Sequence, residues 1–235
     1  MLEAFLRIDV WWILGVTSVV VGLFLFLALS QRKQSERVKW ILFLGLTFPI
    51  LISTLYLIVS TVYQNLASIS KGPVHWHADF LIRACGEEIR LKQPSGLSNY
   101  IGTPLFHEHG DRRLHVEGKP QSFEDITLRA FLQAIGGDLT ESSLAIPVDS
   151  DLRILSNGQT CRDGSRGTLQ VFVYRVKNGR ARQEKLSHAP VYILSPHTLV
   201  PPGDCIIFEF GPPRTRTDLV CPSYRLAEQR GELVI

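Results

Sequence analysis

Two long uncharged stretches near the start of the chain constrain its fold more than any other feature. Residues 10 to 30 read VWWILGVTSVVVGLFLFLALS, and residues 40 to 63 read WILFLGLTFPILISTLYLIVSTVY. A bilayer core about 30 Å thick is crossed by a helix of about 20 residues, and membrane helices tolerate an internal proline such as Pro49. We therefore predict two transmembrane helices in a membrane anchor of residues 1 to 65.

Each stretch has one other interpretation. The first could be a cleaved signal peptide, but it lacks a basic start and a small-residue cleavage site. The second could be a buried core helix, but it is longer and more uniformly apolar than such a helix usually is. The membrane interpretation is therefore favoured for both.

The segment between the two stretches predicts their orientation. Residues 31 to 39, QRKQSERVK, carry four basic residues against the single acid Glu36, and basic loops stay in the cytoplasm. We therefore expect a cytoplasmic loop, two termini outside, and an extracytoplasmic domain of residues 66 to 235 in the periplasm or at the cell exterior. The predicted partners are the lipid bilayer and a further membrane or periplasmic protein.

The cysteines agree with an exported domain. All four lie after the apolar stretches, at Cys85, Cys161, Cys205 and Cys221, and none forms a CxxC pair. An even number of cysteines in an oxidising compartment predicts disulfides, with three pairings that the sequence leaves open. The alternative is metal ligation by thiolates, which the wide and irregular spacing disfavours. A net charge of only +3, spread along the chain, excludes nucleic acid as a partner.

The exported part has the pattern of a mixed α+β domain. Residues 77 to 91 alternate around a Cys-Gly turn, which predicts a hairpin, and residues 93 to 105 have a loop composition. Helical spacing and a Gly-Gly stop predict one main helix over residues 126 to 135. Strand patterns follow it, with Asn-Gly turns, in LRILSNG, TLQVFVYRVKNGRARQ, VYILSP and GDCIIFEFG. We expect five to seven short strands and one helix, an arrangement similar to a β-grasp.

Histidine is the most unusual feature of this domain. Five of the seven histidines, at His75, His77, His107, His109 and His115, fall within 41 residues. Side chains two residues apart in a strand point to the same face. The pairs HWH and HEH and the pair formed by His115 and Glu117 would therefore each present two ligands on one side of a strand. We predict that the two HxH pairs form the core of one site and that His115 and Glu117 add a ligand or an outer contact.

The ligand types narrow the choice of metal. Imidazole nitrogen binds zinc, copper, nickel and iron, whereas the only methionine is Met1 and the cysteines are expected to be oxidised. Copper(II) or zinc is therefore the predicted cofactor. Asp79 and Asp111 lie close to the histidine pairs in the sequence and are candidates for carboxylates that orient the imidazoles.

Histidines also occur as ordinary structural residues that pack and hydrogen-bond. This interpretation is favoured for His188 and His197, which lie outside the paired segments. Acidic residues such as Glu87 and Glu88 are typical of a solvated turn. Three paired segments in so few residues favour metal binding over the structural interpretation for the rest.

The order HWHADF, FHEHGDRRLHVEG, TLRAFL and PPGDCIIFEFG resembles a family of membrane-anchored extracytoplasmic His-rich proteins of largely unassigned function. The resemblance covers roughly residues 73 to 211, and Glu108 stands where threonine is more usual. It implies metal binding and no particular reaction.

Three hypotheses for the function follow. The first is a membrane-tethered module that holds copper or zinc for storage, delivery or sensing. The second is a metalloenzyme in which histidines hold the ion and Glu108 or Glu117 is the general base. The third is a structural or accessory subunit of a membrane complex without a metal.

Overall fold

The computed structural model describes residues 9–30, 35–149, 151–194 and 203–235. The chain divides into two compact units, Met1–Ala67 and Ser68–Ile235. Part of the basic segment, residues 31 to 34, lies outside the described residues.

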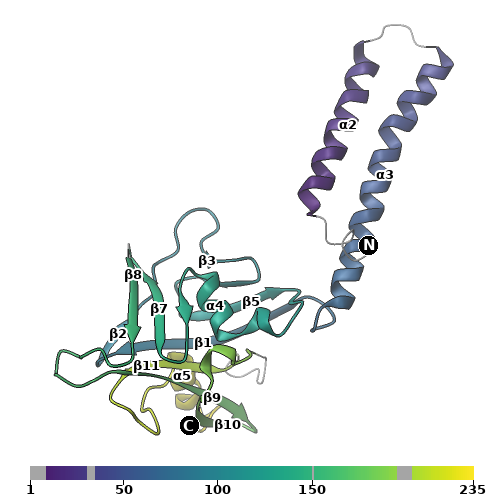
Figure 1. Ribbon diagram of the computed structural model, residues 1–235. Coiled ribbons are helices and arrows are strands. Elements are labelled where there is room, and N and C mark those ends of the chain that lie inside the picture. Colours follow the sequence, from purple (N-terminus) through teal and green to yellow (C-terminus); the bar gives the residue numbers. More distant parts are fainter. Residues whose placement is uncertain (1–8, 31–34, 150, 195–202) are drawn as a thin grey trace. The chain divides into compact units, whose positions relative to one another are not determined.

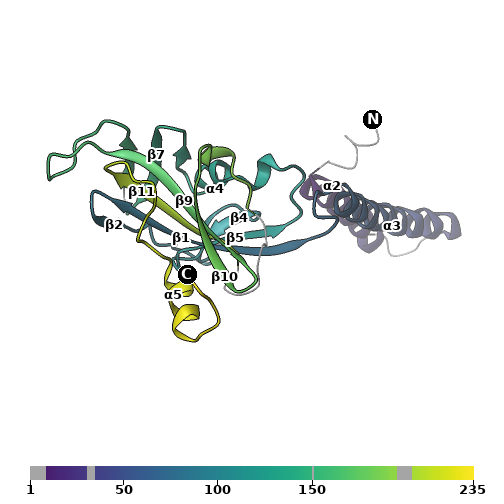
Figure 2. The ribbon, with the colours of Figure 1, turned by 90° about the horizontal axis from the view of Figure 1, so that it is seen from below.

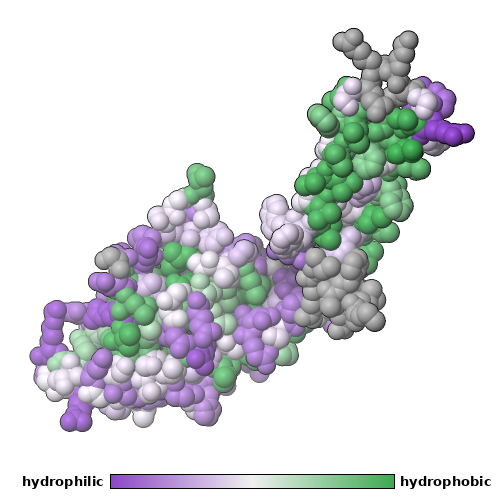
Figure 3. All heavy atoms as spheres, turned by 45° about the horizontal axis from the view of Figure 1, so that its top comes forward, coloured by the Kyte–Doolittle hydropathy of each residue, from purple (hydrophilic) through white to green (hydrophobic). Residues whose placement is uncertain are grey.

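The first unit contains two helices, α2 (Val10–Ser30) and α3 (Glu36–Ala67) (Figure 1). Both are long and apolar enough to cross a membrane. Figure 3 shows hydrophobic side chains over most of the surface of this hairpin that faces the viewer. Helix α3 runs beyond the predicted stretch at both ends and contains Pro49. The two apolar helices are confirmed, and the crossing of a membrane stays a prediction.

The second unit is built on an eight-stranded mixed sheet (Figures 1 and 2). Its order is β10-β9-β11-β1-β5-β4-β3, with β2 also paired to β1. Strands β1 and β11 are parallel, and the other pairs are antiparallel. The strands are β1 (Val74–Ala84), β2 (Glu87–Ile89), β3 (Ile101–Gly102), β4 (Phe106–Glu108), β5 (Arg113–Gly118), β9 (Thr168–Lys177), β10 (Arg180–Lys185) and β11 (Cys205–Gly211).

One face of this sheet carries the main hydrophobic core. Alternate residues of β1, from Ala78 to Ala84, point into it and pack with Phe106, Leu114 and Phe208. The core is closed by helix α4 and a second sheet of order β6-β7-β8. These elements are α4 (Leu128–Ala134), which follows a 3-10 turn at Glu124–Ile126, β6 (Asp138–Leu139), β7 (Ser143–Val148) and β8 (Asp151–Ser156).

On the opposite face of the main sheet, helix α5 (Pro222–Gln229) covers one part and the histidines lie on another. Helix α5 packs through the buried Tyr224 against Phe172, Tyr174 and Ile207 of β9 and β11. The histidines of β1, β5 and β4 lie on this same face, beside the part that α5 covers. This follows because they alternate along their strands with the residues of the main core.

Two disulfides hold the unit together. One joins Cys85, in the turn between β1 and β2, to Cys161, and the other joins Cys205 at the start of β11 to Cys221, the N-cap of α5. The prediction of two disulfides is confirmed, and the pairing that the sequence left open is now defined. No cysteine is left to supply a thiolate to a metal.

The Cys85–Cys161 bridge closes a loop with a sequence separation of 76 residues. Replacing both cysteines with alanine is expected to lower the free energy of unfolding by about 2 to 5 kcal/mol, because a cross-link across a long loop restricts the unfolded chain. Denaturant unfolding of the full-length protein in detergent checks this, with the reduced wild type as the matched control. A double variant as stable as the oxidised wild type would contradict the expectation.

The main predicted elements are present. The hairpin around Cys85 and Gly86, the turn at Asn178 and Gly179, and the helix near residues 126 to 135 all form. The mixed α+β class is confirmed, while the similarity to a β-grasp stays a prediction. The structure has eleven strands in its described residues rather than five to seven, since several contain only two or three residues.

Two parts of the strand and helix prediction are wrong. The segment VYILSP does not form a strand in its described part: Ala189–Val191 is a 3-10 turn, and Ile193 makes a single bridge to Thr127. The second departure is α5, which makes a second helix where one was expected. Its local pattern is short and polar, and contact with the sheet stabilises it through one buried side.

Candidate metal centre

Strand β5 lies between the two histidine pairs. His115 of β5 is opposite His77 of β1 on one side and His107 of β4 on the other, and Glu117 is opposite His75. Directly opposed residues in a sheet have their side chains on the same face. The sheet therefore places four of the predicted histidines and Glu117 on one face, with His115 at the centre rather than at the margin. His109 follows the end of β4, and its ring contacts that of His115.

The rings surround His115 closely. The ring centroids of His77 and His109 lie 4.6 and 4.8 Å from that of His115, both edge to face. His107 stacks on the ring of His115 at 5.3 Å, and the centroid of His75 lies 6.0 Å away. His115 is only 9% exposed, so the cluster has a buried centre.

The histidine nitrogens form two trios that share His115. In each of the trios His75–His77–His115 and His107–His109–His115, the ligand-type nitrogens lie within 4.8 Å of one another. A tetrahedral ion with bonds of about 2 Å holds its ligand atoms about 3.3 Å apart. Side-chain rotations of modest size would therefore bring either trio onto one ion.

Backbone carbonyls fix the tautomers of the pair on the β4 side. Nδ1 of His107 lies 3.2 Å from the carbonyl oxygen of Thr103, and Nδ1 of His109 lies 2.7 Å from that of Asn99. A carbonyl oxygen only accepts, so each Nδ1 carries the proton and donates, and each Nε2 keeps a lone pair. Metal-binding histidines are commonly oriented by such a contact. Sequence reasoning missed these two partners, since every residue has a carbonyl.

The pair on the β1 side meets a carboxylate. Nε2 of His75 lies 2.8 Å from Nε2 of His77 and 2.9 Å from Oε1 of Glu117. Oε1 of Glu117 is also 4.0 Å from Nε2 of His107. Three ligand-type atoms from β1 and β5 thus converge at one point, and Glu117 reaches toward the β4 side as well.

The centre favours neutral imidazoles. Burial is the largest cause that lowers the pKa of His77 and of His107 below the usual range, and neighbouring histidines add to it. Burial, followed by the charge of His77, lowers the pKa of His115 to about 4. Neutral imidazole is the form that binds a metal, because its nitrogen lone pair is free.

Neither nitrogen of the His115 ring has a hydrogen-bond partner among the described residues, although both are buried. Its nearest carboxylate oxygen, Oδ2 of Asp111, is 3.7 Å from Nε2, which is too long for a hydrogen bond. Each buried unpaired polar atom costs about 1 to 3 kcal/mol. An ordinary structural histidine would not leave both nitrogens in this state.

The two aspartates predicted to orient imidazoles differ in position. Asp111 lies beside His115, as just described. Asp79 points to the same face but accepts from Nε of Arg113 at 2.7 Å and from the hydroxyl of Ser223 in α5. Asp79 therefore joins α5 to the sheet through these contacts, and the role of orienting an imidazole stays a prediction for it.

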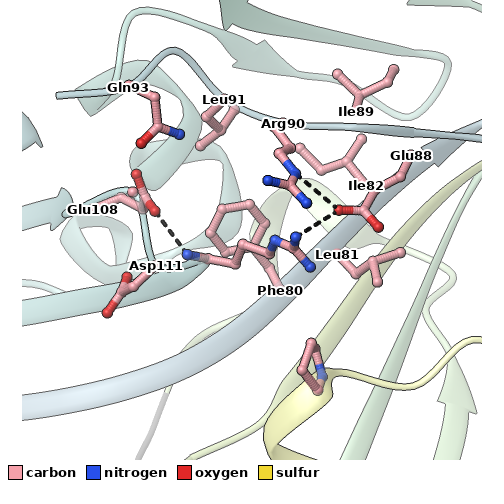
Figure 4. A pocket seen from close by; sticks show the side chains of 13 residues that line it. Phe80, Leu81, Ile82, Glu88, Ile89, Arg90, Leu91, Gln93, Glu108 and Asp111 are labelled. Carbon is pink, nitrogen blue, oxygen red and sulfur yellow. Dashed lines mark hydrogen bonds and ion pairs between the residues drawn. The ribbon is translucent and has the colours of Figure 1, made fainter.

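Glu108, the first candidate for a general base, points away from the histidines. It alternates with His107 and His109 and lines a cavity of about 390 Å³ between the edge of β1 and the turn before β5 (Figure 4). Its Oε1 accepts from the backbone N–H of Arg112, and burial is the largest cause that raises its pKa. The proposal that Glu108 acts on a bound ion does not agree with this placement.

The remaining histidines lie apart from the centre where they are described. His188 is exposed, with Nδ1 3.2 Å from Oε1 of Glu141. His197 lies outside the described residues.

Comparisons of the chain with models of protein families, with curated proteins and with solved structures found no match. The geometry of the site is therefore the basis for its proposed function.

The lowered pKa of His115 predicts a loss of stability in acid for the metal-free protein. Its pKa is about 4 in the folded state and about 6.5 in the unfolded chain. The unfolded chain therefore binds more protons between these values, so stability is fully present above about pH 6.5 and falls by on the order of 2 kcal/mol as the pH drops toward about 4. Denaturant unfolding with chelator present, at several pH values, measures this.

The matched control is His115→Gln, which has no imidazole to titrate. Its unfolding free energy is expected to depend less on pH than that of the wild type across the same window. Equal slopes for the two proteins would show that His115 does not titrate as the structure indicates.

Proposed function

We propose that the protein is a membrane-tethered extracytoplasmic module that binds copper(II) or zinc through its histidine cluster. The observation that carries this proposal is His115, a buried imidazole with two unpaired nitrogens at the centre of four other histidine rings. A bound ion would take a lone pair of this ring and offset the cost of its burial.

The available ligands support copper(II) or zinc. Imidazole with an added carboxylate suits both ions, whereas Mg²⁺ and Ca²⁺ prefer oxygen ligands. The cysteines are in disulfides and the only methionine is Met1. A soft site for copper(I) therefore has no support in this domain.

One side of the cluster is open to solvent. The side chains of His75 and Glu117 are 60% and 41% exposed, while that of His107 is 6% exposed. An ion bound between the buried His107 and the exposed His75 and Glu117 can enter and leave from the solvent side without unfolding of the domain. This favours delivery or sensing of the metal over a closed structural site.

The thermal midpoint of the full-length protein in detergent tests the proposal. A ligand that binds only the folded state stabilises it, by about 2.7 kcal/mol at 100 times its Kd. After chelation, added zinc is expected to raise the midpoint, whereas the same concentration of magnesium leaves it unchanged. Equal responses to the two ions would contradict a histidine-based site.

The proposed topology places residues 31 to 39 in the cytoplasm and the sheet unit outside. It is supported by two helices of sufficient length and by two disulfides, which form in oxidising compartments. A maleimide needs a free thiol, and all four native cysteines are in disulfides, so only the introduced cysteine is expected to react. Ser35→Cys is expected to react with an impermeant maleimide only from the cytoplasmic side, and Gln121→Cys only from outside.

Intact cells and permeabilised cells provide the two measurements. If Ser35→Cys were labelled in intact cells and Gln121→Cys were not, the result would show the opposite orientation to the one proposed. Labelling of both variants in intact cells would contradict a cytoplasmic loop between two spans.

A further inference from the structure

His115 belongs to both histidine trios, and this sharing has a geometric origin. His77 stands on β1, on one side of β5, and His109 follows β4, on the other side. Their rings meet the ring of His115 at similar centroid distances, 4.6 and 4.8 Å, and at similar interplanar angles, 80° and 85°. One ring from β1 and one from the segment after β4 thus flank His115 at similar distances and angles, whereas His107 stacks on His115 and His75 is tilted to it.

A single ion would leave one of the two nitrogens of the His115 ring without a partner. Both Nδ1 and Nε2 are buried and without a partner among the described residues. One ion binds one of these nitrogens, and the other would remain a buried unpaired group at a cost of about 1 to 3 kcal/mol. Ions on both sides of the ring would satisfy both nitrogens.

Two carboxylates adjoin the cluster. Oε1 of Glu117 is 2.9 Å from Nε2 of His75 and 4.0 Å from Nε2 of His107, so it lies between the two trios. Oδ2 of Asp111 is 3.7 Å from Nε2 of His115, the ring that both trios share. Two divalent cations held close together need nearby negative charge, and these two carboxylates supply it.

We propose that the cluster is a dinuclear site in which the imidazolate of His115 bridges two divalent ions. This rests on the proposed metal-binding function. His75 and His77 would complete one ion's ligands, with His109 and His107 on the other. The first ion binds one lone pair of neutral His115. The second forms a bond to the other ring nitrogen, whose N–H bond breaks, and that proton is released to solvent.

Titration of the chelated full-length protein in detergent with copper(II) tests the bridge. Two copper(II) ions joined by an imidazolate are magnetically coupled, so their electron paramagnetic resonance signals cancel at low temperature. The integrated signal is expected to rise up to one bound equivalent and then to fall as the second equivalent binds. Two bound equivalents with a signal twice that of the first would overturn the bridge.

The stoichiometry separates the bridge from the function on which it rests. One bound equivalent with a full signal would overturn the dinuclear site and leave a single-ion module. No bound copper or zinc would overturn both proposals.

Two matched variants each remove a ligand from one of the two trios. His75→Ala and His109→Ala are each expected to bind one copper ion fewer than the wild type and to show the full signal of an isolated ion. Neither side chain belongs to the buried core, since His75 is exposed and His109 is half-buried. A coupled pair of ions in either variant would show that the trios do not correspond to separate ions and would overturn the assignment.

Discussion

Replacing His115 with alanine is expected to lower the affinity for copper(II) or zinc by at least about 100-fold, the upper range for loss of a group that only orients a ligand. The loss of affinity is expected to be larger for His115 than for any other histidine of the cluster, because both trios lose a ligand when His115 is replaced. His77→Ala and His109→Ala each remove a ligand from one trio, so a loss of at least about tenfold is expected. Competition titration against a chelator of known affinity gives all three values.

His188→Ala is the matched control for these variants. His188 is exposed and lies 3.2 Å from Glu141, outside both trios, so its replacement is expected to leave the affinity unchanged. Small and equal losses at His77, His109, His115 and His188 would mean that the cluster is structural.

Gly203→Ala is expected to lower the free energy of unfolding by about 2 to 5 kcal/mol, a large effect for a single substitution. Gly203 has a φ of 78°, which L-residues avoid, and a Cβ there would overlap the carbonyl oxygen of His77. Both costs combine, since a neighbouring backbone cannot move aside as a side chain can. Denaturant unfolding of the full-length protein measures the loss.

Gly179→Ala separates the two causes. Gly179 has a φ of 71° but open space around a Cβ, so only the backbone strain of about 1 to 2 kcal/mol is expected. Because the clash at Gly203 involves the backbone of His77, Gly203→Ala should also weaken metal binding, whereas Gly179→Ala should not. Equal stabilities of the two variants would contradict the close approach of Gly203 to β1.

Local sequence patterns predicted the elements that depend on local chemistry. Uncharged runs of sufficient length became α2 and α3, and the Asn178-Gly179 turn formed because its residues tolerate a positive φ. Helix α5 was missed because its stability comes from tertiary contacts: Tyr224 packs on β9, about fifty residues earlier, and the Cys205–Cys221 bridge joins the helix to β11. Such contacts leave no local periodicity.

The site was predictable in composition but not in arrangement. The i, i+2 spacing correctly placed His75 with His77 on one face, and it also separates Glu108 from the histidines on either side. The order of strands was not visible, because the pairing of β1 with β5 joins segments more than thirty residues apart. That pairing moves His115 to the centre and leaves Asp79 beside Arg113.

Metal analysis of the purified full-length protein tests the central claim most directly. The protein is stripped with chelator, dialysed against zinc or copper(II) at neutral pH, freed of loosely bound ion, and measured for metal per chain. At least about one tightly bound equivalent, held by neutral imidazoles, is expected. Less than about 0.1 equivalent of either metal, with no uptake on reconstitution, would contradict it.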